Sequence, residues 1–395
     1  MSRTYRVAYL VSHPIQYQAP LLRRIAAGDE IDLTVTFLSD FSAREHAHPG
    51  FERRVAWDVP LLSGYRHQAL SSAPSVSFLR PLALDLPARI AAGAYDALWV
   101  HGWSQLALLR AVCAASKAGV PVLLRGESVP GERAPARRAA ARWLFRRVAA
   151  CLPIGARNRA FYRENDVPEE QLFDAPYGVD NERFRAQAEA AAPNRAALRA
   201  ELGLDAGRPV LLFASKLIER KRPGLLLDAY RRLSADGREP RPYLLFVGEG
   251  PQRVVLERRV RELGWGSVRF LGFRNQTELP ALYDLCDAFV LPSAFETWGL
   301  VLNEAMNAGR PVIASDAVGA VPDLVLSGET GYVFPSGDAE ALSQSLRRVL
   351  DDPEHARRLG EGARRAVEAY GLDAAHRGLL RALDFVCARE GRSAA

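Results

Sequence analysis

The stretch that decides the fold runs from residue 288 to residue 309 and reads AFVLPSAFETWGLVLNEAMNAG. It opens with the apolar run Ala288 to Leu291, which has the length and composition of a buried strand. A turn at Pro292-Ser293 follows. A helix is expected from about Gly299 to Gly309, where a glycine can end the helix. A short buried strand that leads through a loop into a helix is the repeating unit of a parallel α/β sheet.

The same alternation continues outward in both directions. Further strands are expected at 6–12, 31–39, 95–101, 120–124, 151–154, 209–215, 243–247, 268–271 and 312–315. Helices are expected at 17–27, 105–118, 135–149, 223–234 and 251–263, and residues 185–207 read as a polar helical linker. Residues 40–94 are Pro-rich and are expected to be irregular.

Two such sets predict an α/β protein with two doubly wound, Rossmann-like domains. We expect an N-terminal domain over residues 1–185 and a C-terminal domain over residues 186–370. A C-terminal helix within residues 371–395 is expected to return to the N-terminal domain. Ligands of such folds bind at the carboxyl ends of the strands, so the cleft that the two domains face is the expected site.

Composition excludes several classes of protein. The 395 residues are 48% hydrophobic and 25% charged, which excludes a disordered or collagen-like chain. The net charge of +6 is too small to indicate a nucleic-acid binder. None of the four cysteines lies in a C-x-x-C pair or has zinc spacing to histidine, so neither a disulfide scaffold nor a zinc site is expected. Without a long apolar run, the expected location is cytoplasmic.

The loop and helix after Leu291 carry two glutamates. Glu296 is expected in the loop, and Glu304 one turn into the helix. The first amides of that helix, near Gly299, Leu300 and Val301, form a site suited to a phosphate. Carboxylates repel phosphate but accept hydrogen bonds from the hydroxyl groups of a sugar or ribose. The alternative is a solvated glutamate and a glutamate that only favours the helix dipole.

Basic residues follow an earlier strand. Lys216 is expected at the end of the strand 209–215, and Lys221 just before the helix at 223–234. Two ammonium groups there can neutralise a diphosphate. The alternative is an ordinary basic loop, and the turn Gly248-Glu249-Gly250 is not diagnostic alone.

Taken in order, these motifs resemble the retaining nucleotide-sugar glycosyltransferases of family 4, which have the GT-B fold. The E-x7-E pair Glu296 and Glu304, followed by AMNAGRPVIAS, resembles that family's signature. The segment Lys216 to Lys221 resembles its R-L-x-x-x-K, with lysine where arginine is usual. Residues 271–273, which include Phe273, and 283–293 resemble the segment that touches the base. Residues 176–184, PYGVDNERF, resemble the end of its first domain.

The N-terminal half resembles a bacterial subgroup with an HPIQY-type first loop. The match covers HPIQYQAPL at residues 13–21 and WDVPLLSGY at residues 57–65. Because no glycine lies between His13 and Gln18, direct amide contact of this loop with phosphate is not expected. Gln16 and Tyr17 are candidates for acceptor or sugar contacts, with a helix start and a core tyrosine as the alternative.

Two further strand ends carry candidates. His101 matches the family's histidine at the donor sugar, with a purely structural histidine as the alternative. Arg125 and Glu127 end the next strand and either pair with each other or contact the acceptor.

The resemblance implies transfer of a sugar from a nucleoside diphosphate sugar to a hydroxyl acceptor with retention at the anomeric carbon. Lys216, Lys221 and the helix start at residues 299–301 would stabilise the departing diphosphate. Glu304 would hold the ribose, and Glu296 would position the donor sugar. No Asp-x-Asp pair occurs in the chain, so a metal-independent enzyme without a cofactor is expected.

Two alternatives to a transferase stay open. A nucleotide-sugar epimerase would share the fold, and a non-catalytic nucleotide-sugar-binding protein would share the site. The acceptor is expected to be a glycan, a lipid-linked or a small molecule, with a role in cell-surface polysaccharide or glycoconjugate synthesis.

The helix expected at 135–149 raises a membrane hypothesis. It carries several arginines around Trp143, Leu144 and Phe145, and residues 1–184 hold 23 − 18 = +5 of the net charge. A basic helix with aromatic residues can lie on the anionic inner face of a plasma membrane. The alternative is that the apolar residues pack on the sheet and the arginines face water.

Overall fold

The computed structural model describes residues 3–131, 134–235 and 240–393. The chain forms two compact units. Unit 1 comprises Met1–His46, Val59–Gly178 and Gly371–Ala395, and unit 2 comprises Ala47–Asp58 and Val179–Tyr370. The main boundary therefore lies before the one expected at residue 185, and the last helix belongs to unit 1.

Unit 1 is built on a six-stranded parallel sheet in the order β5-β2-β1-β6-β7-β8. Its strands are β1 (Tyr5–Val11), β2 (Ile31–Phe37), β5 (His67–Ala69), β6 (Ala97–His101), β7 (Val122–Arg125) and β8 (Ala150–Cys151). Its helices are α1 (Ala19–Ala26), α2 (Leu86–Ala92), α3 (Leu106–Lys117), α4 (Pro135–Phe145), α5 (Ala156–Glu164) and α15 (Leu372–Ser393).

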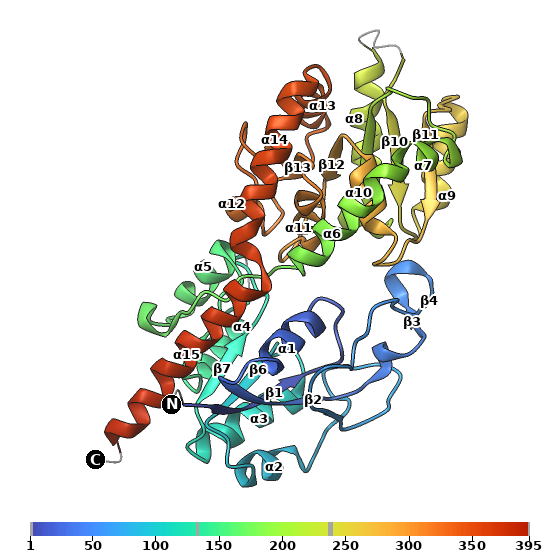
Figure 1. The fold of residues 1–395 in the computed structure, drawn as a ribbon. Helices are drawn as coiled ribbons and strands as arrows, with labels where there is room; N and C mark the ends of the chain where they lie inside the picture. The colour runs from blue at the N-terminus through green and yellow to red at the C-terminus, as the bar shows by residue number, and fades with distance from the viewer. Residues whose placement is uncertain (1–2, 132–133, 236–239, 394–395) are drawn as a thin grey trace. The chain divides into compact units, whose positions relative to one another are not determined.

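Alternating side chains of these strands bury both faces of the sheet. Ala8 and Leu10 of β1 join an apolar core that includes residues of α2, α3, α4 and α5. Tyr9 points to the other face and packs against Trp99 of β6, with 4.2 Å between the ring centroids. Figure 1 shows α15, in red, running beside α1, in blue. The C-terminal helix is thus part of the N-terminal sheet's covering.

Unit 2 repeats the plan with a six-stranded parallel sheet in the order β11-β10-β9-β12-β13-β14. Its strands are β9 (Val210–Ala214), β10 (Tyr243–Val247), β11 (Val268–Gly272), β12 (Ala288–Leu291), β13 (Val312–Ser315) and β14 (Gly331–Phe334). A separate two-stranded sheet pairs β3 (His46–His48) with β4 (Arg53–Val55).

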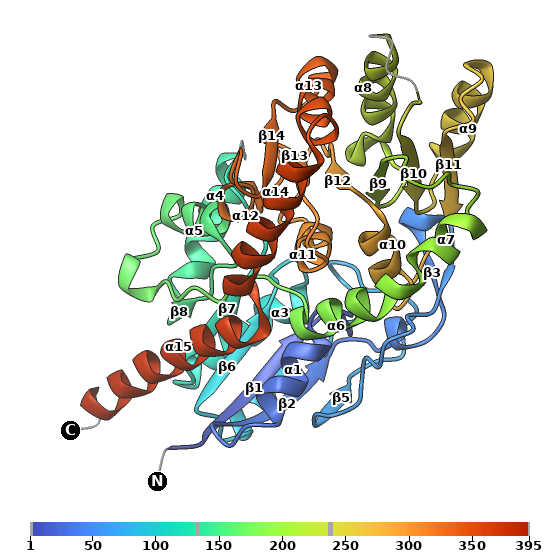
Figure 2. The same ribbon diagram turned by 45° about the horizontal axis from the view of Figure 1, so that its top comes forward.

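The helices of unit 2 cover both faces of its sheet. They are α6 (Asn181–Ala191), α7 (Arg195–Glu201), α8 (Pro223–Ala235), α9 (Arg253–Glu262), α10 (Leu279–Leu285), α11 (Leu300–Asn307), α12 (Val321–Leu324), α13 (Ala339–Leu350) and α14 (Pro353–Ala366). Leu211 and Phe213 of β9 join a core with α8, α9 and α13, and Figure 2 shows α13 beside α8. Phe289 of β12 packs from the other face against Tyr283 of α10.

Both sheets confirm the predicted doubly wound α/β architecture. In each sheet the strand order reverses beside the first strand, between β1 and β6 in unit 1 and between β9 and β12 in unit 2. Ligands of open parallel sheets bind outside the carboxyl ends of the strands at such a reversal. A ligand site is therefore expected among the residues that follow β1, β6, β9 and β12.

The prediction that residues 40–94 are irregular is wrong in part. This stretch holds β3, β4, β5 and α2. Each of the three strands is three residues long, which is too short to show an alternating pattern in the sequence.

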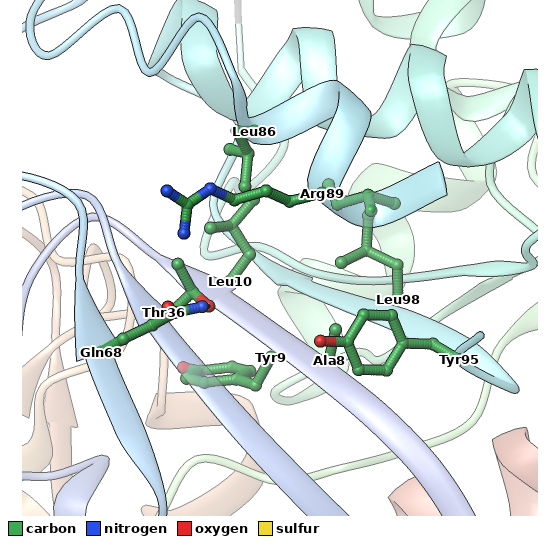
Figure 3. A pocket seen from close by; sticks show the side chains of 10 residues that line it. Ala8, Tyr9, Leu10, Thr36, Gln68, Leu86, Arg89, Tyr95 and Leu98 are labelled. Atoms are coloured by element: carbon green, nitrogen blue, oxygen red, sulfur yellow. The ribbon is translucent and has the colours of Figure 1, made fainter. Parts of the chain in front are cut away.

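A small hollow of unit 1 lies between α2 and strands β1, β2 and β6. Its volume is about 20 Å³, room for roughly one water molecule. Figure 3 shows the polar ends of Thr36 and Gln68 beside each other at its wall, and the Gln68 amide donates to the Thr36 hydroxyl at 3.1 Å. The residues of β1 that line the hollow are Ala8, Tyr9 and Leu10.

Candidate active site

The loop after β9 is held against the turn after β10. The amide of Ser215 donates to Val247 O at 3.0 Å, and the amide of Leu217 donates to Glu249 O at 2.8 Å. Gly248 has a φ of 130°, and a Cβ there would lie 2.0 Å from Ser215 O. The Gly248-Glu249-Gly250 turn, which is not diagnostic in the sequence, is therefore what allows the close approach that positions Lys216.

A buried ion pair joins the loops on either side of the strand-order reversal. The Lys221 ammonium, after β9, contacts Glu296 Oε1, after β12. Their side chains are only 12% and 10% exposed. Ser293 Oγ also donates to Glu296 Oε1 at 2.9 Å, and Arg220 Nη1 lies 4.0 Å from Glu296 Oε2. Burial lowers the pKa of Lys221, against the opposing effect of the Glu296 carboxylate.

Lys216 adds a second ammonium to this region. Burial lowers its pKa, and the positive charges of Lys221 and Arg220 lower it further. A lysine whose neighbours disfavour its own charge favours an incoming anion, because the anion relieves both the repulsion and the lost hydration. The cluster of Lys216, Arg220, Lys221 and Glu296, called here the cationic cluster, is thus suited to a ligand of high negative charge.

The start of α11 lies directly after Glu296. Gly299 precedes the helix with a φ of 111°, and a Cβ there would lie 3.0 Å from Val318 Cγ1. The amide of Leu302 donates a hydrogen bond to Gly299 O at 2.9 Å. The amides of Leu300 and Val301 come before Leu302 in the first turn of the helix, where N–H groups have no partner within the helix. Both residues are half-buried. The amides at the start of α11 therefore follow the loop that holds Glu296 by only a few residues.

Glu304 is placed differently from Glu296. It lies on α11 with no exposed surface, and its Oε2 accepts a hydrogen bond from Tyr283 Oη at 2.6 Å. The sequence motif does not reveal the Tyr283 partner, because that residue is on another helix. The ribose contact expected of Glu304 stays a prediction.

Phe273 follows β11 directly and is half-buried. Its ring contacts Phe51, with 5.0 Å between the centroids. Phe51 belongs to the Ala47–Asp58 part of unit 2, which comes from far earlier in the sequence.

In unit 1, a polar cluster lies at the carboxyl ends of β6 and β7. His101 is 6% exposed, and its Nε2 lies 3.6 Å from Glu127 Oε1. Tyr177 Oη donates to the same Glu127 oxygen at 2.6 Å, and Gln18 Nε2 donates to Tyr177 Oη at 2.9 Å. Burial lowers the pKa of His101, with Glu127 opposing, so the imidazole is neutral at pH 7.

The Arg125 side chain is buried in the interior of unit 1. It is 1% exposed, and its Nη2 donates to Ala175 O at 3.0 Å and to Pro176 O at 3.1 Å. Its guanidinium also lies 4.9 Å from the centre of the Tyr177 ring. The roles expected for Arg125 and Glu127, a mutual pair or an acceptor contact, stay predictions, and the Arg125 side chain is buried. The Arg125 guanidinium thus fixes the backbone at Ala175 and Pro176 and packs on the Tyr177 ring, while the Glu127 side chain is 41% exposed.

The loop after β1 holds the remaining candidates. His13, Gln16 and Tyr17 are half-buried, and His13 Nδ1 lies 2.9 Å from Ser12 Oγ. Sequence reasoning missed Gln18 and Tyr177. Both lie inside quoted motifs, HPIQYQ and PYGVD, but neither residue type has a distinctive signal at a single position.

Three other expectations concern metals, thiols and membranes. Within residues 3–131, 134–235 and 240–393 there is no group of three metal-ligating side chains and no helix long and apolar enough to cross a membrane. None of the four cysteines, all of which lie in the described ranges, forms a disulfide. Leu144 and Phe145 of α4 are buried, while Trp143 is 46% exposed with the Arg147 guanidinium 3.9 Å from its ring centre.

The sequence matches known proteins over much of its length. The profile of the family described as Glycosyl transferases group 1 matches residues 194–366. The alpha-D-kanosaminyltransferase of Streptomyces kanamyceticus is 32% identical over 61% of this chain and 61% of that protein. The GDP-mannose-dependent alpha-(1-6)-phosphatidylinositol monomannoside mannosyltransferase of Mycolicibacterium smegmatis is 30% identical over 68% of this chain and 71% of that protein.

Other matches are partial. A D-inositol 3-phosphate glycosyltransferase of Streptomyces avermitilis is 35% identical over 50% of this chain, and the match spans 43% of that protein. The chain thus spans less than two thirds of the first and third of these relatives.

Solved structures share the fold. A glycosyltransferase from Rickettsia africae superposes with a TM-score of 0.75 at 15% identity over 97% of this chain and 98% of that one. Anabaena HepE in complex with UDP and glucose superposes with a TM-score of 0.72 at 19% identity over 96% of this chain and 99% of that one.

Proposed function

Because the chain belongs to the group 1 glycosyl transferases, we propose that it transfers a sugar from a nucleoside diphosphate sugar to a hydroxyl acceptor with retention at the anomeric carbon. The cationic cluster and the start of α11 are the observation that carries this proposal. They lie after β9 and β12, on either side of the strand-order reversal in unit 2.

The group that most needs stabilisation in this reaction is the departing diphosphate. Negative charge grows on its oxygens as the glycosidic bond lengthens, so preorganised positive charge favours the transition state over the ground state. Lys216 and Lys221 supply full charges, and the amides of Leu300 and Val301 supply dipoles. A ligand diphosphate competes with Glu296 for Lys221, which would leave the Glu296 carboxylate able to hold a donor-sugar hydroxyl.

Retention follows if the acceptor hydroxyl attacks from the face that the diphosphate leaves. In that arrangement the departing phosphate oxygen can take the acceptor's proton, and no enzyme nucleophile is required. His101 would contact the donor sugar as a neutral imidazole, which can donate from one nitrogen and accept at the other. In this proposal Lys216, Lys221 and the amides at the start of α11 take the place of a divalent cation, so the reaction needs no metal.

The relatives suggest the acceptor class. The names of three relatives contain a polyhydroxylated compound: 2-deoxystreptamine, D-inositol 3-phosphate and phosphatidylinositol monomannoside. We propose a polyhydroxylated acceptor, either a small molecule or a lipid-linked glycan, used in cell-surface polysaccharide or glycoconjugate synthesis. The enzyme would act in the cytoplasm, and a lipid-linked acceptor would bring it to the inner face of the plasma membrane.

A donor screen tests the proposal. Uridine, guanosine and adenosine diphosphate sugars are added one at a time, and the midpoint of thermal unfolding is measured. A donor at a hundred times its Kd should stabilise the protein by about 2.7 kcal/mol. Lys221→Met should abolish that shift, whereas Lys117→Met, an exposed lysine of α3, should keep it.

Turnover then separates the alternatives. The proposal expects sugar transfer that depends on an added acceptor, with the anomeric configuration of the donor retained in the product by NMR. An inverted product, or conversion of the donor sugar without any acceptor, would contradict a retaining transferase. Donor binding without turnover across an acceptor panel would favour a binding protein.

A further inference from the structure

One short part of unit 2 comes from an unexpected place in the sequence. Ala47–Asp58, called here the 47–58 segment, lies between two stretches of unit 1 but belongs to unit 2. It contains the end of β3 and all of β4. In Figures 1 and 2 the blue β3 lies near the yellow end of β11.

Hydrogen bonds fix the segment to the loop after β11. Asn275 Nδ2 donates to Ala56 O at 2.7 Å. Asp58 Oδ2 accepts from the amide of Thr277 at 3.1 Å and also from its hydroxyl. These contacts hold the segment at the carboxyl end of the sheet, on the β10–β11 side of the strand-order reversal.

The contact is rich in flat side chains. The Phe51 ring meets Phe273 nearly edge-on, with 5.0 Å between centroids and 76° between planes. The Arg53 guanidinium lies 5.0 Å from the Phe273 ring centre, and the Trp57 ring centroid lies 6.4 Å from it. Phe51 and Trp57 are half-buried and Arg53 is exposed, so this group of rings reaches the surface.

The same rings adjoin the cationic cluster. The Lys216 ammonium lies 5.3 Å from the centre of the Phe51 ring. The chain also comes close at Gly50, where a Cβ would lie 2.7 Å from Lys216 Cδ. The aromatic rings therefore lie next to the Lys216 ammonium, which is proposed to bind the diphosphate. A nucleoside diphosphate likewise carries a flat base at one end and its phosphates at the other.

We propose that the 47–58 segment completes a nucleobase subsite, in which Phe51, Arg53 and Trp57 act with Phe273 to select the base of the nucleotide donor. Aromatic rings and the guanidinium plane recognise flat bases by stacking, and the guanidinium can also donate to a base carbonyl. The inference rests on the proposed function for the presence of a nucleotide. It adds that a stretch from the N-terminal half of the chain determines which nucleotide binds.

Titration calorimetry with UDP, GDP, ADP and inorganic pyrophosphate tests this subsite. Pyrophosphate carries the charge without a base. For Arg53→Ala and Phe51→Ala we expect the affinity for the preferred nucleotide to fall about tenfold, and the preference among the three bases to shrink. Pyrophosphate affinity should stay within about twofold for Arg53→Ala. Phe78→Ala, an aromatic that is 55% exposed in unit 1, is the matched control and should change nothing.

The outcomes are separable. Unchanged base preference in a folded Arg53→Ala variant would overturn the inference, as would an equal loss for pyrophosphate and nucleotides, which would mean that the segment only supports Lys216. Because Arg53 is exposed, its variant remains informative if Phe51→Ala does not fold. If the wild type binds no nucleotide and no pyrophosphate, the proposed function fails. If the wild type binds both and Lys221→Met alone weakens both, the function stands and the nucleobase subsite fails.

Discussion

Replacing Glu296 by glutamine should destabilise the folded protein by about 3 kcal/mol at neutral pH. The substitution keeps the size of the side chain and an oxygen that accepts from Ser293, and it removes only the charge that faces Lys221. Breaking one side of a buried ion pair costs about 3–5 kcal/mol, because the other charge is left in a poor solvent. We take the lower end because the two side chains retain 12% and 10% exposure.

The double variant and the pH dependence make this prediction specific. Lys221→Met combined with Glu296→Gln should be less destabilised than the sum of the two single variants, because the double variant buries no unpaired charge. Burial already lowers the pKa of Lys221, and loss of Glu296 removes the group that opposes this shift. Raising the pH neutralises the orphaned amine, so the stability gap between wild type and Glu296→Gln should narrow as the solution becomes alkaline.

The assay is urea and thermal unfolding of the wild type, both single variants and the double variant, measured at pH 7 and at pH 9.5. Coupling of at least about 1.5 kcal/mol at pH 7 is expected from the cycle. Coupling under about 0.5 kcal/mol, or a gap that widens with pH, would refute the buried pair and the argument that a diphosphate displaces Glu296.

Four further results are expected. Glu304→Gln, which keeps an acceptor for Tyr283, should weaken UDP and donor binding alike by calorimetry, since a hydrogen bond to a charged group is worth about 1.5–3 kcal/mol; unchanged affinity would remove Glu304 from the site. Nucleotide affinity should fall as pH rises through the lowered pKa of Lys216, which lies below the ordinary 10.5, because the anion binds the protonated amine. Activity should survive EDTA, and a strict need for magnesium or manganese would contradict the charge argument. Charge reversal at Arg138 of α4 and at Arg146, the residue that follows this helix, should reduce sedimentation with anionic liposomes and spare nucleotide binding; a wild type that never binds such liposomes would contradict the membrane hypothesis.

Local sequence patterns were enough to predict most strands of the two sheets and several of their helices. Ala288–Leu291, Tyr243–Val247 and Val312–Ser315 are strands with the bounds that their apolar runs indicate. The expected helix after Glu296 begins at Leu300, with Gly299 as the left-handed residue before it. Such signals are readable because a strand or helix is specified by residues within a few positions of one another. The same holds for the loops after β9 and β12, where basic and acidic residues stand at strand ends.

The partners inside each cluster depend on packing between distant segments. Lys221 and Glu296 meet because β9 and β12 are neighbours in the sheet, although these residues lie 75 positions apart. Arg125 is buried because the stretch at residues 175–177 returns across it. The 47–58 segment joins unit 2 through Asn275 and Thr277, more than 200 positions later. No periodicity encodes such contacts, because their free energy comes from surfaces that exist only once the sheets have formed.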